Sequence, residues 1–134
     1  MIKIYCDANI FIDYFYSRKD KFRDLGEFAY QIFKRTLDCE FHIILSDWLL
    51  YELKNYIEDE KLKEFLNDFK KKNKIIKVYK NLEDVKNAKL ISSHYQDVLH
   101  SILAKKAGAK YLITRNIKDY SNTKDLEIKL PENV

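Results

Sequence analysis

Glycine and proline are scarce in this chain of 134 residues, which has only two glycines and one proline. Flexible linkers and low-complexity tracts are usually rich in such residues, so the sequence offers no boundary between domains. With 46% apolar residues, a chain of this length can bury roughly two thirds of the surface that it exposes when unfolded. We therefore expect one globular domain spanning residues 1–134.

Cysteine is also rare, and Cys6 and Cys39 lack the CxxC or CxxH spacing of a zinc site. The chain opens directly into a strand-like pattern instead of a secretory signal, which favours a reduced, cytoplasmic protein. A membrane-spanning helix needs about 20 consecutive apolar residues, and the sequence has no such run. We accordingly expect no membrane partner.

Charge of one sign is only in mild excess. Lysine and arginine number 25 against 21 acids, which leaves a formal net charge of +4 and a pI near 8.9. This balance favours a polyanionic partner but is shared by many unrelated proteins. The lysine run at 70–74 is more typical of a solvated helix end than of a nucleic-acid contact.

Strand-like and helix-like apolar patterns alternate along the chain. Strands are predicted over residues 2–6, 41–45, 75–79 and 111–113, with a brief last one at 126–130. Helical spacing occurs at 10–16, 21–38, 60–72, 82–91 and 95–107, and after Ser46 or Asp47 as a cap. This alternation predicts an α/β fold in which helices cover both faces of a central, mostly parallel sheet of four to five strands.

Four carboxylates occur where such a fold would deliver them to one cleft. Asp7 comes directly after the first strand, and Asp119 comes shortly after the fourth. Glu52 is predicted in the first turns of the helix that leaves the second strand, and Asp97 near the start of the helix over 95–107. Ligands of open α/β sheets bind outside the carboxyl ends of the strands, so we expect these acids to share one site.

Clustered carboxylates raise one another's pKa unless a cation is bound. Oxygen ligands of this kind suit Mg²⁺ or Mn²⁺, and such ions activate water and stabilise the leaving oxygen of a phosphodiester. Taken singly, an aspartate after a strand is more often a turn or cap residue. Their joint placement favours a metal-dependent nuclease.

The segments around these acids resemble the motifs of the PIN-domain family, metal-dependent ribonucleases that include VapC toxins and RNA-processing nucleases. Residues 4–13 (IYCDANIFID) resemble the opening hhhDxNhhhD, and 46–53 resemble S-x5-E-L. Residues 97–104 resemble D-x-x-h-x-x-h-A, and 114–120 resemble T-x-N-x-x-D-F, with Tyr120 in place of the commoner phenylalanine. The resemblance covers nearly the whole chain.

The resemblance implies a three-layer α/β/α sandwich in which the four acids bind Mg²⁺ or Mn²⁺ and are catalytic. It also implies supporting roles for Asn9 and Thr114 as orienting groups and for Asn116 in holding the cleft or positioning water. Arg115, with other basic residues of the rim, would hold substrate phosphates. The implied partners are RNA, an antitoxin protein where the chain is a toxin, and a second copy in a homodimer.

Alternatives remain open beside the nuclease. A catalytically inactive domain of the same fold would bind RNA or a protein, although retention of all four acids counts against it. A doubly wound phosphatase is disfavoured, because Asp7 is not followed two residues later by a second acid.

Several other residues receive structural interpretations. His100 is read as packing and Asp13 as a cap or a salt bridge with a neighbouring lysine. Phenylalanines such as Phe22 follow core spacing, whereas the aromatic residues 14–16 are candidates for base contact.

Overall fold

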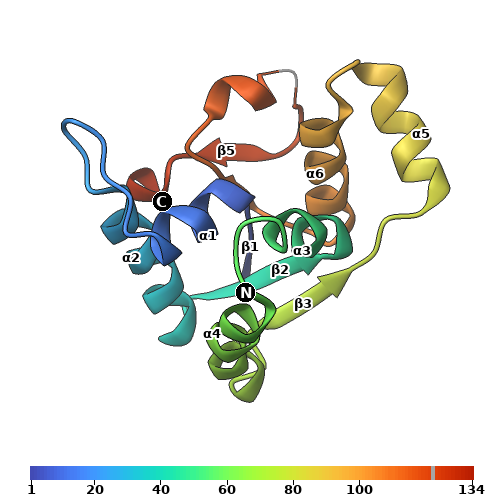
Figure 1. Ribbon diagram of the computed structural model, residues 1–134. Coiled ribbons are helices and arrows are strands. Elements are labelled where there is room, and N and C mark those ends of the chain that lie inside the picture. The colour runs from blue at the N-terminus through green and yellow to red at the C-terminus, as the bar shows by residue number, and fades with distance from the viewer. Residues whose placement is uncertain (122) are drawn as a thin grey trace.

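A central parallel sheet organises the computed structural model of the chain, which describes residues 1–121 and 123–134 (Figure 1). Its strands are β1 (Ile2–Cys6), β2 (Phe41–Ser46), β3 (Ile75–Val78), β4 (Tyr111–Ile113) and β5 (Glu127–Lys129). They lie in the order β3-β2-β1-β4-β5, and every neighbouring pair is parallel. The predicted sheet is confirmed, including its brief last strand.

Helices cover both faces of this sheet and complete the predicted α/β/α sandwich. One face carries α1 (Ala8–Phe15), α2 (Leu25–Leu37) and α4 (Asp59–Lys71), and the other carries α6 (Tyr95–Lys106), on which α5 (Leu82–Ile91) packs (Figure 1). The short α3 (Asp47–Leu53) leaves the carboxyl end of β2. Crossovers between parallel strands are right-handed. The chain adds strands from β1 through β2 to β3 and then returns to β4 on the other side of β1, so the helices before and after β3 lie on opposite faces of the sheet.

The core occupies both faces of the sheet, because neither face is left to solvent. Ile4 and Tyr5 in the central strand β1 are fully buried. On the α1 side, aromatic rings from three helices interlock: Phe33 of α2 lies 5.1 Å from Phe11 of α1 and 5.0 Å from Phe65 of α4 between ring centroids. Edge-to-face and tilted pairs of this kind add to the stabilisation that burial alone provides.

The helix predicted over 21–38 begins later than its apolar spacing indicates. Asp24 has non-helical backbone angles, and its side chain accepts a hydrogen bond from the backbone N–H three residues on, so α2 starts at Leu25. Asp20 forms a second local turn by accepting from the backbone N–H of Phe22 at 2.9 Å. Phe22 is consequently 86% exposed, and the core role predicted for it is wrong.

Ser46, not Asp47, caps α3. The Ser46 Oγ accepts a hydrogen bond from the backbone N–H of Leu49 at 2.9 Å. The carboxylate of Asp47 accepts from the backbone N–H of the next residue, Trp48, and from that of Lys80, each at 2.9 Å. It therefore ties α3 to the segment that follows β3.

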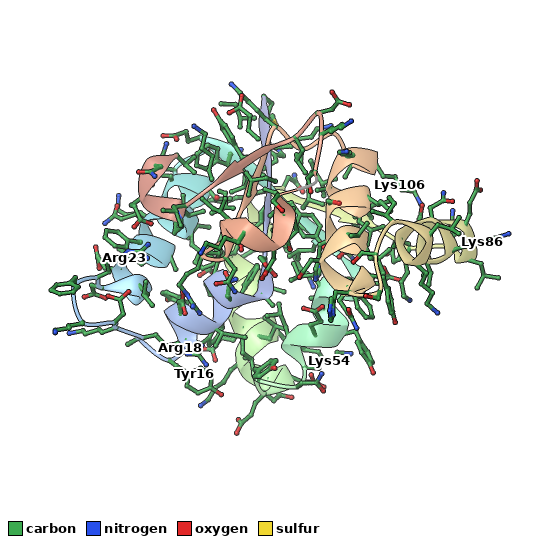
Figure 2. The ribbon with its side chains drawn as sticks, turned by 90° about the horizontal axis from the view of Figure 1, so that it is seen from above. Tyr16, Arg18, Arg23, Lys54, Lys86 and Lys106 are labelled. Carbon is green, nitrogen blue, oxygen red and sulfur yellow. The ribbon has the colours of Figure 1, made fainter. Side chains whose placement is uncertain are left out.

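The helix α5 stands away from the sheet and packs mainly on α6, as Figure 1 shows. A reciprocal capping box between Asn81 and Asp84 starts it, and Lys106 of α6 donates to Asp84 at 3.0 Å. Lys86 points away from the body of the molecule in Figure 2. Gly108 follows α6 with a φ of +81°, which confirms its predicted capping role.

The strand order reverses between β1 and β4, which lie side by side in the sheet. The backbone N–H of Asp7 donates to the Ile113 carbonyl at 2.9 Å, so the residues after these two strands begin together. The chain then passes through the short 3-10 turn η1 (Ile117–Tyr120) before β5 and the terminal turn η2 (Pro131–Asn133). Such a reversal point is where open α/β sheets bind ligands. Within the described ranges, no helix has the length and apolar character needed to cross a membrane.

Candidate active site

Asp7 lies at this reversal point and is held by donors on both carboxylate oxygens. It is 7% exposed and caps α1, with its Oδ1 accepting from the backbone N–H of Ala8 at 2.7 Å. Its Oδ2 accepts from the Thr114 hydroxyl at 3.1 Å and from the Tyr120 hydroxyl at 3.0 Å. Hydrogen bonds to a carboxylate are stronger than those between neutral groups, so this side chain is fixed in direction.

Asn9 and Thr114 connect the ends of β1 and β4 around Asp7. The Asn9 amide donates to the Thr114 hydroxyl oxygen at 3.2 Å and accepts from the backbone N–H of Arg115 at 3.2 Å. The backbone N–H of Asn116 also donates to the Thr114 hydroxyl oxygen, at 3.1 Å. This geometry suits the orienting role predicted for Asn9 and Thr114, whereas Asn116 takes part here through its backbone.

Tyr120 contributes a hydroxyl that sequence reasoning undervalued. Tyr120 stands where the family motif commonly has phenylalanine, and its added hydroxyl donates to Asp7 from a side chain that is only 3% exposed. Burial, followed by the nearby charge of Asp7, raises the pKa of the Tyr120 phenol far above its ordinary value. The hydroxyl therefore stays protonated and acts as a permanent donor.

Glu52 lies in the last turn of α3, not in its first turns as predicted, because α3 contains only seven residues. Its Oε1 lies 3.0 Å from the Nε2 of His100. The other ring nitrogen of His100 lies 2.5 Å from the Tyr5 hydroxyl, which lies 2.6 Å from the Ser46 hydroxyl. The Glu52 carboxylate can only accept, so these contacts fit an imidazole whose Nε2–H donates to Glu52.

His100 thus combines the predicted packing role with a polar one. It is fully buried, and its ring packs edge-on against the ring of Tyr5 at 5.5 Å. Both ring nitrogens are engaged, so it orients Glu52 through the Nε2 contact. The signal in the sequence was its position three residues after Asp97, which places both on one face of α6.

Asp97 lies in the first turn of α6 and is electrostatically coupled to the other acids. Burial raises its pKa from 3.8 to about 6, and the charges of Asp7, Asp119 and Glu52 add to the increase, while His100 opposes it. A carboxyl in this state is costly to ionise without a counter-charge. Asp7, Glu52 and Asp119 therefore all lie close enough to Asp97 to affect its ionisation.

Asp119 occupies η1 on the exposed side of this site. Together with Asp97 it lines a cleft of about 490 Å³ between α6 and η1. Lys105 and Lys118 line the same cleft. Acidic and basic groups therefore meet there, which suits a ligand that carries both a bound cation and phosphate charges.

The donor set fits a hard divalent cation. Ligand atoms of Asp7, Glu52 and His100 lie within 4.8 Å of one another. Because both nitrogens of His100 are already engaged, carboxylate oxygens are the available donors. Across residues 1–121 and 123–134, no lysine or arginine forms a salt bridge with any of the four acids. Oxygen-rich sites without an internal counter-charge suit Mg²⁺ or Mn²⁺.

Arg115, which was predicted to hold substrate phosphates, forms a salt bridge with Asp13. Its Nε and a terminal nitrogen donate to the two Asp13 oxygens at 2.9 and 3.2 Å, and the Asp13 side chain is 2% exposed. Arg18 lies 4.0 Å from the same carboxylate. Asp13 thus pairs with arginines, not with a neighbouring lysine, and Arg115 fastens the turn after β4 to α1.

The aromatic residues predicted to contact bases lie elsewhere. Tyr14 packs on Phe33 at 5.5 Å, and Phe15 packs on Phe65 at 5.1 Å, so both belong to the core layer beneath α1. The exposed Tyr16 donates its hydroxyl to the backbone carbonyl of Tyr56. The Tyr14 and Phe15 rings are half-buried, so packing takes up part of each, and base contact by these residues stays a prediction.

A parallel sheet sandwiched by helices, with acids gathered where the strand order reverses, defines the PIN-domain class of α/β proteins. The chain belongs to this family, because the PIN-domain family profile matches residues 3–118. No curated protein matches the chain.

Among solved structures, similarity is found to VapBC2 from Rickettsia felis bound to a DNA fragment from its promoter. The match has a TM-score of 0.62 and 15% sequence identity, and it covers 96% of this chain and 98% of that one. At this identity the comparison demonstrates a shared fold.

Proposed function

We propose that the protein is a metal-dependent ribonuclease that hydrolyses RNA phosphodiester bonds at Asp7, Glu52, Asp97 and Asp119. The observation that carries the proposal is the convergence of these acids on the strand-reversal point, where the pKa of Asp97 rises to about 6. Burying several acids beside one another costs stability, and a bound Mg²⁺ or Mn²⁺ offsets that cost. Membership of the PIN-domain family supports the same reading.

Neighbouring side chains hold the proposed metal ligands Asp7 and Glu52 in position. Thr114 and Tyr120 fix the Oδ2 of Asp7, and His100 fixes Glu52. A divalent ion at such a site supplies activation of water and stabilisation of the leaving oxygen. Pre-set donors keep the carboxylates in place, so little reorganisation is needed when the substrate binds.

Substrate phosphates are repelled by the acids and need a basic contact nearby. Lys105 and Lys118 line the cleft that Asp97 and Asp119 also line. Lysines hold phosphates without reading sequence, so we assign this pair to backbone positioning. RNA as the substrate rests on the family.

The decisive experiment compares cleavage of single-stranded and structured RNA by the wild type, Asp7→Asn and Asp68→Asn. Asp68 is an exposed acid on α4 and serves as the matched control. We expect cleavage with Mg²⁺ or Mn²⁺, none with EDTA, loss of activity in Asp7→Asn and full activity in Asp68→Asn. Equal activity of the two variants, or no cleavage by the wild type with either metal, would refute the proposal.

Metal binding is tested separately from cleavage. Isothermal titration with Mn²⁺ reports directly on the acid cluster, because it needs no substrate. We expect wild-type protein and Asp68→Asn to bind alike and Asp7→Asn to bind at least tenfold more weakly, the range seen when supporting contacts of metal sites are removed.

We infer further that the protein acts as the toxin of a toxin–antitoxin pair. The fold shared with VapBC2 supports this context. So do the exposed apolar side chains of α5, where Leu82 is 90% and Leu90 is 77% exposed, since contiguous apolar surface is typical of protein contacts. A small antitoxin-like reading frame found next to its gene would support the inference, and co-expression with that frame would test it: a stable complex that suppresses cleavage is expected, and undiminished cleavage would contradict it.

A further inference from the structure

Three aromatic rings form a ladder between α3 and α6. Trp48 and Tyr51 of α3 are nearly parallel, with ring centroids 5.7 Å apart and planes 12° apart. Trp48 also stacks on Tyr95 of α6, at 6.5 Å and 28°. We call Tyr51, Trp48 and Tyr95 the aromatic ladder. Its outer ring belongs to Tyr51, which is 64% exposed.

The aromatic ladder adjoins the acids of the proposed active site. Tyr51 precedes Glu52 in α3, and Tyr95 lies two residues before Asp97 in α6. The Trp48 ring lies 6.1 Å from the His100 ring, which orients Glu52. A nucleotide stacked on the ladder would therefore have its backbone close to the acid cluster.

Packing accounts for the inner rings but not for the outer one. Trp48 and Tyr95 are half-buried, and the Trp48 indole N–H donates to the Gln96 carbonyl at 3.2 Å, which fastens α3 to α6. Tyr51 covers little apolar surface, so its exposed ring contributes little to folding. An exposed ring that continues a stack is the usual platform for a nucleobase.

A cation lies over the Tyr95 end of the aromatic ladder, and another follows the Tyr51 end along the chain. Lys89 of α5 lies over the Tyr95 ring, with its Nζ 5.1 Å from the centroid. Lys54 follows Tyr51 by three residues, on the same side of the helix end, and is exposed at the end of α3 in Figure 2. A lysine beside an exposed aromatic face matches a nucleotide, which offers a flat base and a phosphate.

We propose that the exposed face of Tyr51 stacks an unpaired base of the RNA strand beside the cleavage site. The proposal rests on the proposed ribonuclease function. Paired bases are already stacked on their neighbours and cannot present a face to Tyr51, so a duplex gains nothing from this ring. Stacking also tolerates any base, so the ladder selects strand state and not sequence.

The test measures RNA binding in EDTA, where metal-dependent cleavage is absent. Trp48, the only tryptophan of the chain, reports on the ladder through its fluorescence, and anisotropy of a labelled oligoribonucleotide gives the Kd. We compare the wild type with Tyr51→Ala, Tyr51→Phe and Tyr30→Ala. Tyr30 is the matched control, because it is 40% exposed and stacks on Tyr14 of α1, away from the ladder.

Removal of a stacking ring costs about 1–3 kcal/mol per base, so Tyr51→Ala should weaken single-strand binding by about 5- to 150-fold. We also expect RNA to quench the Trp48 fluorescence of the wild type, and Tyr51→Ala should abolish this quenching. Tyr51→Phe and Tyr30→Ala should bind as the wild type does, and duplex binding should not depend on Tyr51. Thermal unfolding midpoints show that each variant is folded.

Three results would overturn the proposal: no single-strand binding by the wild type, an unchanged Kd in Tyr51→Ala, or equal weakening of single-strand and duplex binding. The cleavage assay separates this proposal from the ribonuclease function. Binding that depends on Tyr51 without any cleavage would contradict the nuclease and leave the stacking site standing. Cleavage by a wild type whose RNA binding is unchanged in Tyr51→Ala would contradict the stacking site and leave the nuclease standing.

Discussion

Replacing Asp97 by asparagine removes one negative charge from the acid cluster, and we expect the metal-free protein to become more stable as a result. In the folded chain the pKa of Asp97 is about 6, compared with an ordinary 3.8, first because of burial and then because of Asp7, Asp119 and Glu52. Asparagine has nearly the same shape and no charge to desolvate. The variant therefore avoids the cost of ionising this position.

The sign and size of the effect follow from proton linkage. Between about pH 4 and pH 6 the folded protein holds a proton on Asp97 that the unfolded chain has released, so the free energy of unfolding falls as the pH rises through this window. The difference in pKa corresponds to about 3 kcal/mol at most. Because Asp97 is partly exposed, solvent screening reduces this, and we expect about 1–2 kcal/mol at pH 8.

Urea unfolding in EDTA at a series of pH values measures the effect. Asp97→Asn should match the wild type near pH 4 and exceed its free energy of unfolding above pH 6, whereas the exposed-site control Asp68→Asn should follow the wild type throughout. Addition of Mg²⁺ or Mn²⁺ should reverse the order, because a cation at a hundredfold its Kd stabilises the wild type by about 2.7 kcal/mol. A metal-free Asp97→Asn protein that is less stable than the wild type at pH 8 would refute the reasoning.

Two further substitutions test the contacts around the site by urea unfolding in EDTA. Arg115→Met leaves the buried carboxylate of Asp13 with only Arg18 at 4.0 Å, so we expect a loss of about 3 kcal/mol. Arg18→Met, whose side chain is 45% exposed, should cost less than about 1 kcal/mol, and equal losses would show that Arg115 is not the main partner. Tyr120→Phe removes the 3.0 Å donor to Asp7 and should cost about 2 kcal/mol. An unchanged free energy of unfolding would mean that this hydroxyl does not stabilise the carboxylate.

Local patterns in the sequence predicted the elements well where spacing and burial agree. The helix over 95–107 appears as α6 and is ended by Gly108. The helix over 21–38 was predicted too long, because local side-chain hydrogen bonds from Asp20 and Asp24 compete with helix formation at its start. The spacing of apolar residues does not reveal such competition. For that reason Phe22 was wrongly predicted to lie in the core.

The sequence could predict which residues belong to the candidate site, but not which side chains contact one another there. Asp7 could be placed from the strand before it, since side chains after parallel strands meet at one edge. Glu52 could not be placed within its helix, because the length of α3 depends on where tertiary packing ends it. The partner of Arg115 was also hidden, because Asp13 lies 102 positions away along the chain.

The sequence by itself determined the alternation of strands and helices, the acids that follow them and the family motifs, since all of these depend on spacing along the chain. Only the tertiary structure decided which side chains from distant parts of the chain contact one another. It joined the Tyr120 hydroxyl to Asp7 and His100 to Glu52, and it stacked Tyr51 on Trp48 and Trp48 on Tyr95 beside them. Apart from the Tyr51–Trp48 stack, which joins two residues of α3, these contacts arise where separate elements pack together, and the distance between atoms there is set by the whole fold and not by local pattern.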